Sequence, residues 1–214
     1  MRPTPEAASL RLTRRAQCAA GRADEIDRRA KVDRRTALLA LATLPLATHA
    51  KPPAAVPPEL RGEIPQARLL GDGRLSYFGL PIYDIRLWGK DAALLADPAG
   101  ATLALELQYA RALSGQRIAE RSLQEMQALE TVDAAQAARW LAQMQRLIPD
   151  VDKGDRITGV QQPGQAVRFF VNGAPRGEVR DADFTRLFFG IWLSPRTSQP
   201  ELRAALLGRV AAGS

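Results

Sequence analysis

The sequence predicts an α+β fold, a mostly antiparallel sheet covered on one face by helices. Three observations support this class. Apolar residues alternate with period two from residue 73 to residue 109, recur at helical spacing from 114 to 148, and alternate again from 156 to 179. An apolar helical stretch follows, so the predicted order is strands, two helices, strands, two helices. This order is typical of an open-faced sandwich.

The first strands are predicted at 73–78 and 80–88, joined near Gly79. In the second of them, Tyr83 and the apolar residues at alternate positions after it share one face, because successive side chains of a strand point to opposite sides. A third strand is marked by its apolar face, formed by Leu103, Leu105, Leu107 and Tyr109.

Two helices are predicted next. Ser114 is the predicted N-cap of the first helix, and helical spacing begins after it. Asp133 and Gln136 have the spacing of a capping box for the second helix, which Pro149 ends.

The second group of strands occupies 156–161, 166–171 and 177–179. Pro163-Gly164 forms the first turn, and Asn172-Gly173 is the strongest hairpin signal in the chain.

Two further helices complete the domain. Asp181 or Asp183 caps the first, which is strongly apolar. Ser198 and Glu201 frame a capping box for the last helix.

Charge is distributed unevenly along the 214 residues. Residues 1–50 contain ten Lys/Arg and five Asp/Glu of the totals of 30 and 23, which leaves twenty against eighteen beyond residue 50. The basic character belongs to the N-terminal segment, so no nucleic-acid partner is expected. That segment also holds Cys18 and His49, the chain's only Cys and His. Without it, Cys or His metal ligation, disulfides and Ser-His-Asp or Cys-His catalysis are excluded, and we expect no metal or cofactor.

The segment 33–50 is predicted to be a signal peptide ending near Ala50. Arg34-Arg35 precede a short apolar run that is too short to span a bilayer, followed by small residues. We therefore expect a periplasmic or otherwise exported protein with no stable membrane span after cleavage. The arginine pair fits both the twin-arginine route and ordinary export. A buried helix or an uncleaved anchor are the alternatives.

The remaining boundaries follow from composition. Residues 1–32 are predicted to be a disordered basic extension, either a long leader or the product of an upstream start codon, with Val32 as the alternative start. Residues 51–62 form a predicted Pro-rich linker, and 63–210 form the domain.

Nucleotide and calcium motifs are missing. Gly71-Asp72-Gly73 lacks the third glycine of a phosphate loop and is interpreted as a turn. Asp150, Asp152 and Asp155 fail the spacing of a calcium loop and are interpreted as a solvated turn.

Several segments resemble the bacterial chalcone isomerase-like proteins. They are the strand 73–88, the stretch 113–126, the segment 149–156 and, most specifically, 188–203 (FFGIWLSPRTSQPELR). The resemblance covers nearly all of residues 60–209 and implies an antiparallel sheet covered by helices, in agreement with the predicted element order.

The resemblance also implies what the chain lacks. Plant chalcone isomerases polarise their ketone with an arginine, a tyrosine, an asparagine and threonines. Gly79, Ile118, Glu125 and Leu187 stand at four of these positions, and Arg68 lies within one residue of the arginine. Loss of one oxyanion donor costs about 10²–10³-fold in rate. We therefore expect no catalytic residues for flavanone formation.

The non-enzymatic plant relatives bind fatty acids, which suggests an exported protein that binds a small hydrophobic, fatty-acid-like ligand. The predicted ligand-binding residues are Arg68, Tyr77, Gly79, Arg121 and Glu125, around a cleft between helices 115–129 and 183–193 and strands 73–88. Two alternatives stay open: an isomerase or lyase of unassigned substrate with Glu125 as base, and a partner-binding module without a pocket. Arg121 and Glu125 also have the spacing of an exposed helical ion pair. The sequence assigns no oligomeric state.

Overall fold

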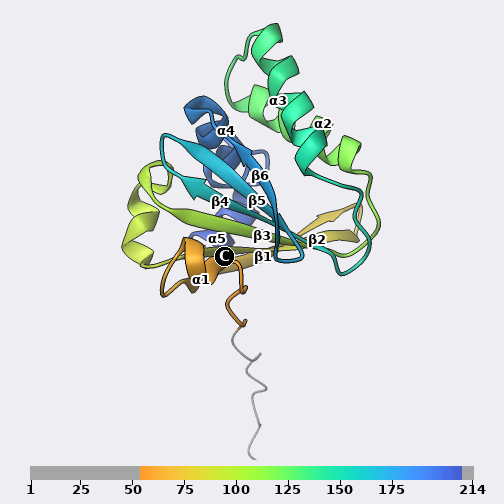
Figure 1. The fold of residues 1–214 in the computed structure, drawn as a ribbon. Coiled ribbons are helices and arrows are strands. Elements are labelled where there is room, and N and C mark those ends of the chain that lie inside the picture. The colour runs from red at the N-terminus through yellow and green to blue at the C-terminus, as the bar shows by residue number, and fades with distance from the viewer. Residues whose placement is uncertain (1–53, 209–214) are drawn as a thin grey trace, which may run out of the picture. The chain divides into compact units, whose positions relative to one another are not determined.

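Six antiparallel strands lie side by side in chain order (Figure 1). A computed structural model describes residues 54–208, so the predicted extension 1–32 and signal peptide 33–50 lie outside the described residues. The strands are β1 (Arg68–Tyr77), β2 (Leu80–Gly89), β3 (Leu103–Tyr109), β4 (Arg156–Gln162), β5 (Ala166–Val171) and β6 (Ala174–Val179). The predicted α+β class and the antiparallel sheet are confirmed.

Register brings the apolar residues of neighbouring strands into rows on one face of the sheet. Leu87 of β2 pairs with Leu105 of β3, which pairs with Gly159 of β4, which pairs with Phe169 of β5. Tyr83 and Tyr109 form a second row near the end of the sheet. Because side chains alternate along a strand, these rows face the helices.

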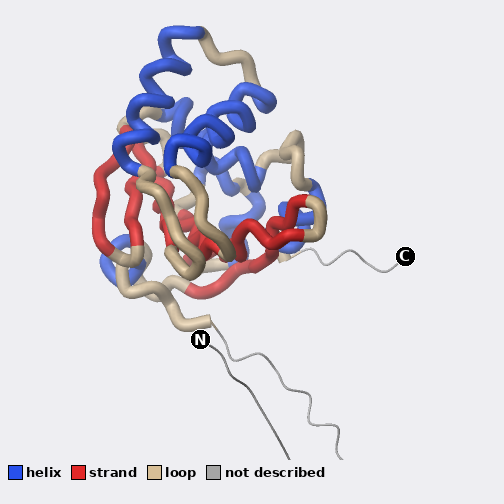
Figure 2. The backbone as a smooth tube through the Cα atoms, turned by 90° about the vertical axis from the view of Figure 1, so that its right-hand side faces the viewer, coloured by secondary structure: helices blue, strands red, loops and turns tan. Residues whose placement is uncertain are grey.

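The helices cover this face (Figure 2). They are α2 (Gly115–Leu129), α3 (Ala134–Leu147), α4 (Ala182–Leu193) and α5 (Pro200–Leu206), while α1 (Leu60–Glu63) and the short 3₁₀ helices η1 (Ala92–Ala96) and η2 (Pro98–Gly100) lie in connections. α4 packs against β4 and β5, α5 packs against β1, and α2 packs against α4. α4 carries the apolar side chains that form most of its contact with the sheet, since eight of its residues are buried.

Helix caps agree with the sequence at two helices and differ at a third. Asp133 caps α3 by accepting hydrogen bonds from two backbone N–H groups, and Asp181 caps α4. Ser114 occupies the N-cap of α2, but its side chain makes no cap hydrogen bond. Asp150 takes over this function, accepting from Gly115 N at 2.8 Å.

The predicted capping box of the last helix is wrong. α5 begins at Pro200 with Gln199 at its N-cap, which has no side-chain cap hydrogen bond. The hydroxyl of Ser198 instead donates to Glu125 of α2 at 2.9 Å, so a tertiary contact replaces the local cap.

The predicted turn at Gly71-Asp72-Gly73 is also wrong, because these residues lie inside β1. A Cβ atom at Gly71 would stand 2.2 Å from the backbone oxygen of Leu206, and one at Gly73 would stand 2.4 Å from the side chain of Leu202. The glycines therefore allow α5 to pack directly on the strand.

The structure also differs from the sequence prediction at the Pro-rich linker 51–62. From residue 54 onward this segment is part of the domain and packs on the sheet face opposite the helices. Leu60 and Ile64 are buried there against Trp88 and Phe170. The sequence signal was weak because only these two large apolar residues lie among charged neighbours.

Ion pairs inside this second face hold the segment 54–64 to the sheet. The fully buried side chain of Glu59 accepts from Arg156 at 3.0 Å and from Thr158 at 2.8 Å. The buried carboxylate of Glu106 accepts from Trp88 Nε1 at 2.8 Å and from Arg86 at 3.1 Å. Carboxylates and guanidinium groups therefore neutralise one another under this cover.

Candidate functional site

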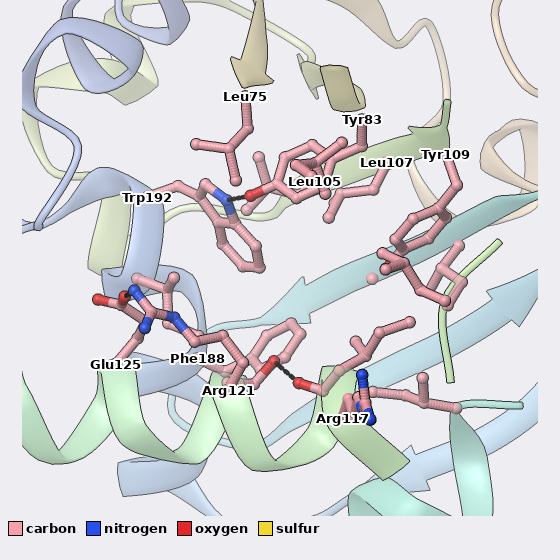
Figure 3. A pocket seen from close by; sticks show the side chains of 18 of the residues that line it. Leu75, Tyr83, Leu105, Leu107, Tyr109, Arg117, Arg121, Glu125, Phe188 and Trp192 are labelled. Atoms are coloured by element: carbon pink, nitrogen blue, oxygen red, sulfur yellow. Dashed lines mark hydrogen bonds and ion pairs between the residues drawn. The ribbon is translucent and has the colours of Figure 1, made fainter. Parts of the chain in front are cut away.

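A cavity of about 310 Å³ lies between the helix-covered face of the sheet, α2 and α4. Figure 3 shows its strand side, with Leu105, Leu107 and Tyr109, opposite residues of α2. Its apolar lining comes from Leu75, Ile82, Leu105, Leu107, Ile118, Ile157, Phe169, Phe188 and Ile191. Gly159 belongs to the floor and leaves room there because it has no side chain. The cavity occupies the place between these elements that the sequence predicts for a cleft.

Two tyrosines provide polar groups on the strand side of the cavity. The hydroxyl of Tyr83 accepts a hydrogen bond from Trp192 Nε1 at 3.0 Å, which leaves its own proton available to donate. Burial raises the pKa of Tyr83 to about 12. Burial also raises the pKa of Tyr109, whose hydroxyl makes no hydrogen bond to any described residue. Both phenols are therefore neutral donors at ordinary pH.

The α2 side of the cavity carries the charges. Glu125 is engaged at both oxygens, by the guanidinium of Arg121 and by the hydroxyl of Ser198. Arg117 lies one helical turn before Arg121, is exposed, and forms no ion pair with the residues from 54 to 208. The rim therefore combines an Arg-Glu ion pair with one arginine, Arg117, that has no acidic partner among the described residues.

The structure brings two of the five predicted site residues to the cavity and places three elsewhere. Arg121 and Glu125 line it. Arg68 is exposed and pairs with Gly89 at the opposite end of the β1–β2 hairpin. Tyr77 is 67% exposed, and Gly79 lies in the turn with φ 76°.

The expectation that Tyr77 and Gly79 share a strand face over the cleft is therefore wrong. β1 ends at Tyr77, and the turn lies beyond Tyr109, the last residue of β3. Alternation along a strand predicts a face, but it does not predict how far a neighbouring strand extends.

Sequence reasoning missed the most important polar residues, Tyr83, Tyr109 and Arg117. Tyr83 and Tyr109 lie on the apolar strand faces that the alternation identifies, where a hydroxyl among aliphatic side chains is an available signal. Arg117 shares the helical face of Arg121 through i, i+4 spacing. Helical spacing alone does not show that Arg121 has an acidic partner, Glu125, and that Arg117 has none among the described residues.

Neither a metal-binding cluster nor a membrane-spanning helix is present among the described residues. Between residues 54 and 208, no group of three or more His, Cys, Asp or Glu side chains is arranged to hold a metal ion. No helix in the same part of the chain has the length and apolar character needed to cross a membrane.

Comparisons with known proteins agree on the fold. An uncharacterized protein of Haemophilus influenzae is 25% identical over 140 residues, which cover 65% of this chain and 67% of that protein. The crystal structure of an Arabidopsis thaliana fatty-acid binding protein matches with a TM-score of 0.55 at 14% identity, over 67% of this chain and 87% of that one. The sequence model of the family described as chalcone isomerase-like matches residues 83–208, more than half of the 214 residues. The chain belongs to the chalcone isomerase-like family.

Proposed function

We propose that this protein is an exported, non-catalytic binding protein for a small amphipathic ligand with an acidic head group, such as a fatty acid. The observation that carries the proposal is the apolar cavity of about 310 Å³ with polar groups along its rim. Small-molecule sites are typically about 300–1,000 Å³, mostly apolar, and carry a few placed polar groups. The volume lies at the small end of this range, which favours a medium-length acyl chain.

The rim offers partners for a carboxylate. Arg117 has no acidic partner among the described residues, so its guanidinium can form charge-assisted hydrogen bonds to a ligand. Tyr83 and Tyr109 are neutral and have hydroxyl protons to donate. An acyl chain would lie against the leucines and isoleucines of the sheet.

The structural neighbour supports the same ligand class. It is named a fatty-acid binding protein, and its fold is shared over most of its chain. At 14% identity this likeness concerns the fold, so the ligand rests on the chemistry of the cavity.

The geometry disfavours the alternative of an isomerase or lyase with Glu125 as base. Both carboxylate oxygens of Glu125 already accept hydrogen bonds, one from Arg121 and one from Ser198. A general base must reach the proton it abstracts, and this carboxylate would first have to leave both partners. The third alternative, a module without a pocket, does not account for an unfilled apolar cavity.

Calorimetric titration with dodecanoate, and with dodecanol as its uncharged counterpart, tests the proposal. Wild type should bind dodecanoate more tightly than dodecanol. Arg117→Ala should weaken dodecanoate binding about tenfold, because a hydrogen bond to a charged group contributes about 1.5–3 kcal/mol, and should leave dodecanol binding unchanged. Arg68→Ala is the matched control, since Arg68 does not line the cavity.

A second variant tests whether the ligand occupies the cavity. A Cβ at Gly159 would make only ordinary contacts, 3.5 Å from Phe188 and 3.6 Å from Val167, so Gly159→Ala should keep binding. Gly159→Leu should fill the space and abolish binding of both ligands. Equal affinity in wild type and Gly159→Leu, no binding by wild type, or turnover of naringenin chalcone would contradict the proposal.

Export is tested separately. The pattern of Arg34-Arg35, a short apolar run and small residues before Lys51 supports cleavage after Ala50. N-terminal sequencing of the protein from its native envelope fraction should give Lys51 as the first residue. An intact segment 33–50 in the cytosolic fraction would contradict export.

A further inference from the structure

The turn between β1 and β2 carries an exposed apolar cluster, which we call the hairpin tip (residues 77–81). Tyr77 is 67% exposed, Phe78 is 89% exposed and Leu80 is 58% exposed. Among the described residues, these three are the only large apolar side chains that are exposed. Single exposed apolar residues are normal, but neighbouring ones that point into solvent together mark an interaction site.

The hairpin tip projects beyond the rest of the sheet. β2 pairs with β3 only from Tyr83 to Gly89, so the tip lies past the end of the neighbouring strand. β1 is the outermost strand on this side of the sheet (Figure 1). The apolar cluster is therefore a convex projection, and this shape suits insertion into a fluid layer better than docking onto a rigid surface.

Folding does not account for an aromatic residue at position 78. Phe78 has φ 48° and Gly79 has φ 76°, so both central residues of this turn are left-handed. Asn followed by Gly is the preferred pair for such a turn, whereas a bulky residue there is strained. Among the aromatic rings of the described residues, the ring of Phe78 contacts only that of its exposed neighbour Tyr77, edge-on at a centroid distance of 4.4 Å. The strained conformation therefore displays an apolar ring to solvent.

The hairpin tip adjoins the cavity through its two flanking residues and lies near two arginines. Leu75 and Ile82, on either side of the tip, line the cavity. Ala110 N donates to Ile82 O at 2.9 Å, which places Arg111 beside the base of the tip. Arg111 and Arg117 are exposed and form no ion pair with the described residues. The nearby Arg74 is neutralised by Asp84.

We propose that the hairpin tip inserts into the surface of a lipid bilayer that contains anionic lipids. Phe78 and Leu80 would enter the acyl boundary and Tyr77 would lie at headgroup level, where amphipathic rings are favoured. Arg111 and Arg117 would face the anionic headgroups. The inference extends the proposed function, since Leu75 and Ile82 beside the tip line the cavity and insertion would bring the cavity close to the bilayer, but insertion does not require a ligand in the cavity.

Sedimentation of the full chain with vesicles tests insertion. Vesicles of phosphatidylcholine alone and of phosphatidylcholine with phosphatidylglycerol serve as probes. Phe78→Asn suits the left-handed turn, so the variant keeps its fold, and it should weaken vesicle binding about tenfold or more. Arg111→Ala should cost about fivefold on the anionic vesicles only. Arg139→Ala, an exposed arginine of α3, is the matched control and should have no effect.

A spectroscopic readout identifies the inserted residue. The emission of Phe78→Trp should shift to the blue when vesicles are added, above the background of the buried Trp88, Trp140 and Trp192. Equal vesicle binding by wild type and Phe78→Asn would overturn the proposal. So would self-association of the wild type without vesicles that Phe78→Asn abolishes, because the tip would then bind a second protein chain. Dodecanoate binding by Phe78→Asn, measured without vesicles, reports on the cavity alone.

Discussion

On the helix-covered face of the sheet, aliphatic and aromatic side chains surround a cavity of about 310 Å³ that no side chain fills. On the opposite face, the segment 54–64 packs on the sheet and contributes Glu59, which pairs with Arg156, while Glu106 of the sheet pairs with Arg86. Unfilled apolar space costs packing contacts, whereas buried carboxylates require their partners to remain in place. One face can therefore accommodate a ligand, while the other is held in place by specific ion pairs.

The largest effect is expected on the paired face, from Glu106→Ala. This variant leaves Arg86 and Arg156 without a shared carboxylate and Trp88 Nε1 without its acceptor. Removing one partner of a buried pair typically costs about 3–5 kcal/mol, so the free energy of unfolding should fall by about 4 kcal/mol. Urea denaturation measures it.

The control for this prediction is Glu178→Ala, which breaks the largely exposed pair with Arg180. Its cost should stay below about 1 kcal/mol. Glu106→Gln keeps an acceptor for Trp88, so its loss in free energy of unfolding should lie between those of Glu106→Ala and Glu178→Ala. Equal losses in Glu106→Ala and Glu178→Ala would remove the distinction between buried and exposed pairs.

A ligand in the cavity should protect the helix-covered face locally, in addition to the global stabilisation that binding to the folded state provides. A ligand that binds only the folded state adds about 2.7 kcal/mol at a concentration of 100 times its Kd. With dodecanoate at that ratio, hydrogen exchange should slow in α2 and α4, which line the cavity. Exchange in the segment 54–64 should slow no more than global stabilisation requires. If hydrogen exchange slowed selectively in the segment 54–64, the ligand would be bound on the face opposite the helices, which would contradict the proposed site.

The third prediction concerns the contacts between the segment 54–64 and the sheet face that it covers. Glu59→Ala removes the bonds to Arg156 and Thr158 but leaves Arg156 beside Glu106. We expect a loss of about 2 kcal/mol, as for a hydrogen bond to a charged group. Exchange in the segment 54–64 should accelerate, while dodecanoate affinity stays at the wild-type value. A parallel loss of affinity would show that the two faces are coupled.

Features that depend on local sequence could be predicted, whereas those that depend on the assembled sheet could not. The element order followed from apolar period, and Arg121 and Glu125 followed from helical spacing, because both signals are local. The pair of Glu59 and Arg156 joins residues 97 positions apart, and no local sequence pattern predicts it. The positions of Tyr77 and Gly79 relative to the cavity depend on where β3 ends, which is a property of the assembled sheet.

The smallest effect concerns the tyrosines of the cavity. Tyr83→Phe removes the acceptor of Trp192 Nε1 and should cost about 1 kcal/mol. Tyr109→Phe should cost less, since the hydroxyl of Tyr109 has no partner among residues 54–208. Urea denaturation at about pH 8 compares the two variants.

The stability of the protein at alkaline pH provides a second test of Tyr83. The pKa of Tyr83 is about 12 in the folded protein and 10.0 ordinarily, so unfolded chains lose the proton first as pH rises. The stabilisation is complete below pH 10 and disappears as pH approaches about 12. Wild type should therefore lose stability across this window, and Tyr83→Phe should lose less. An identical slope in both proteins would show that the hydroxyl of Tyr83 is not held neutral by burial, and the cavity would then be wetter than its lining implies.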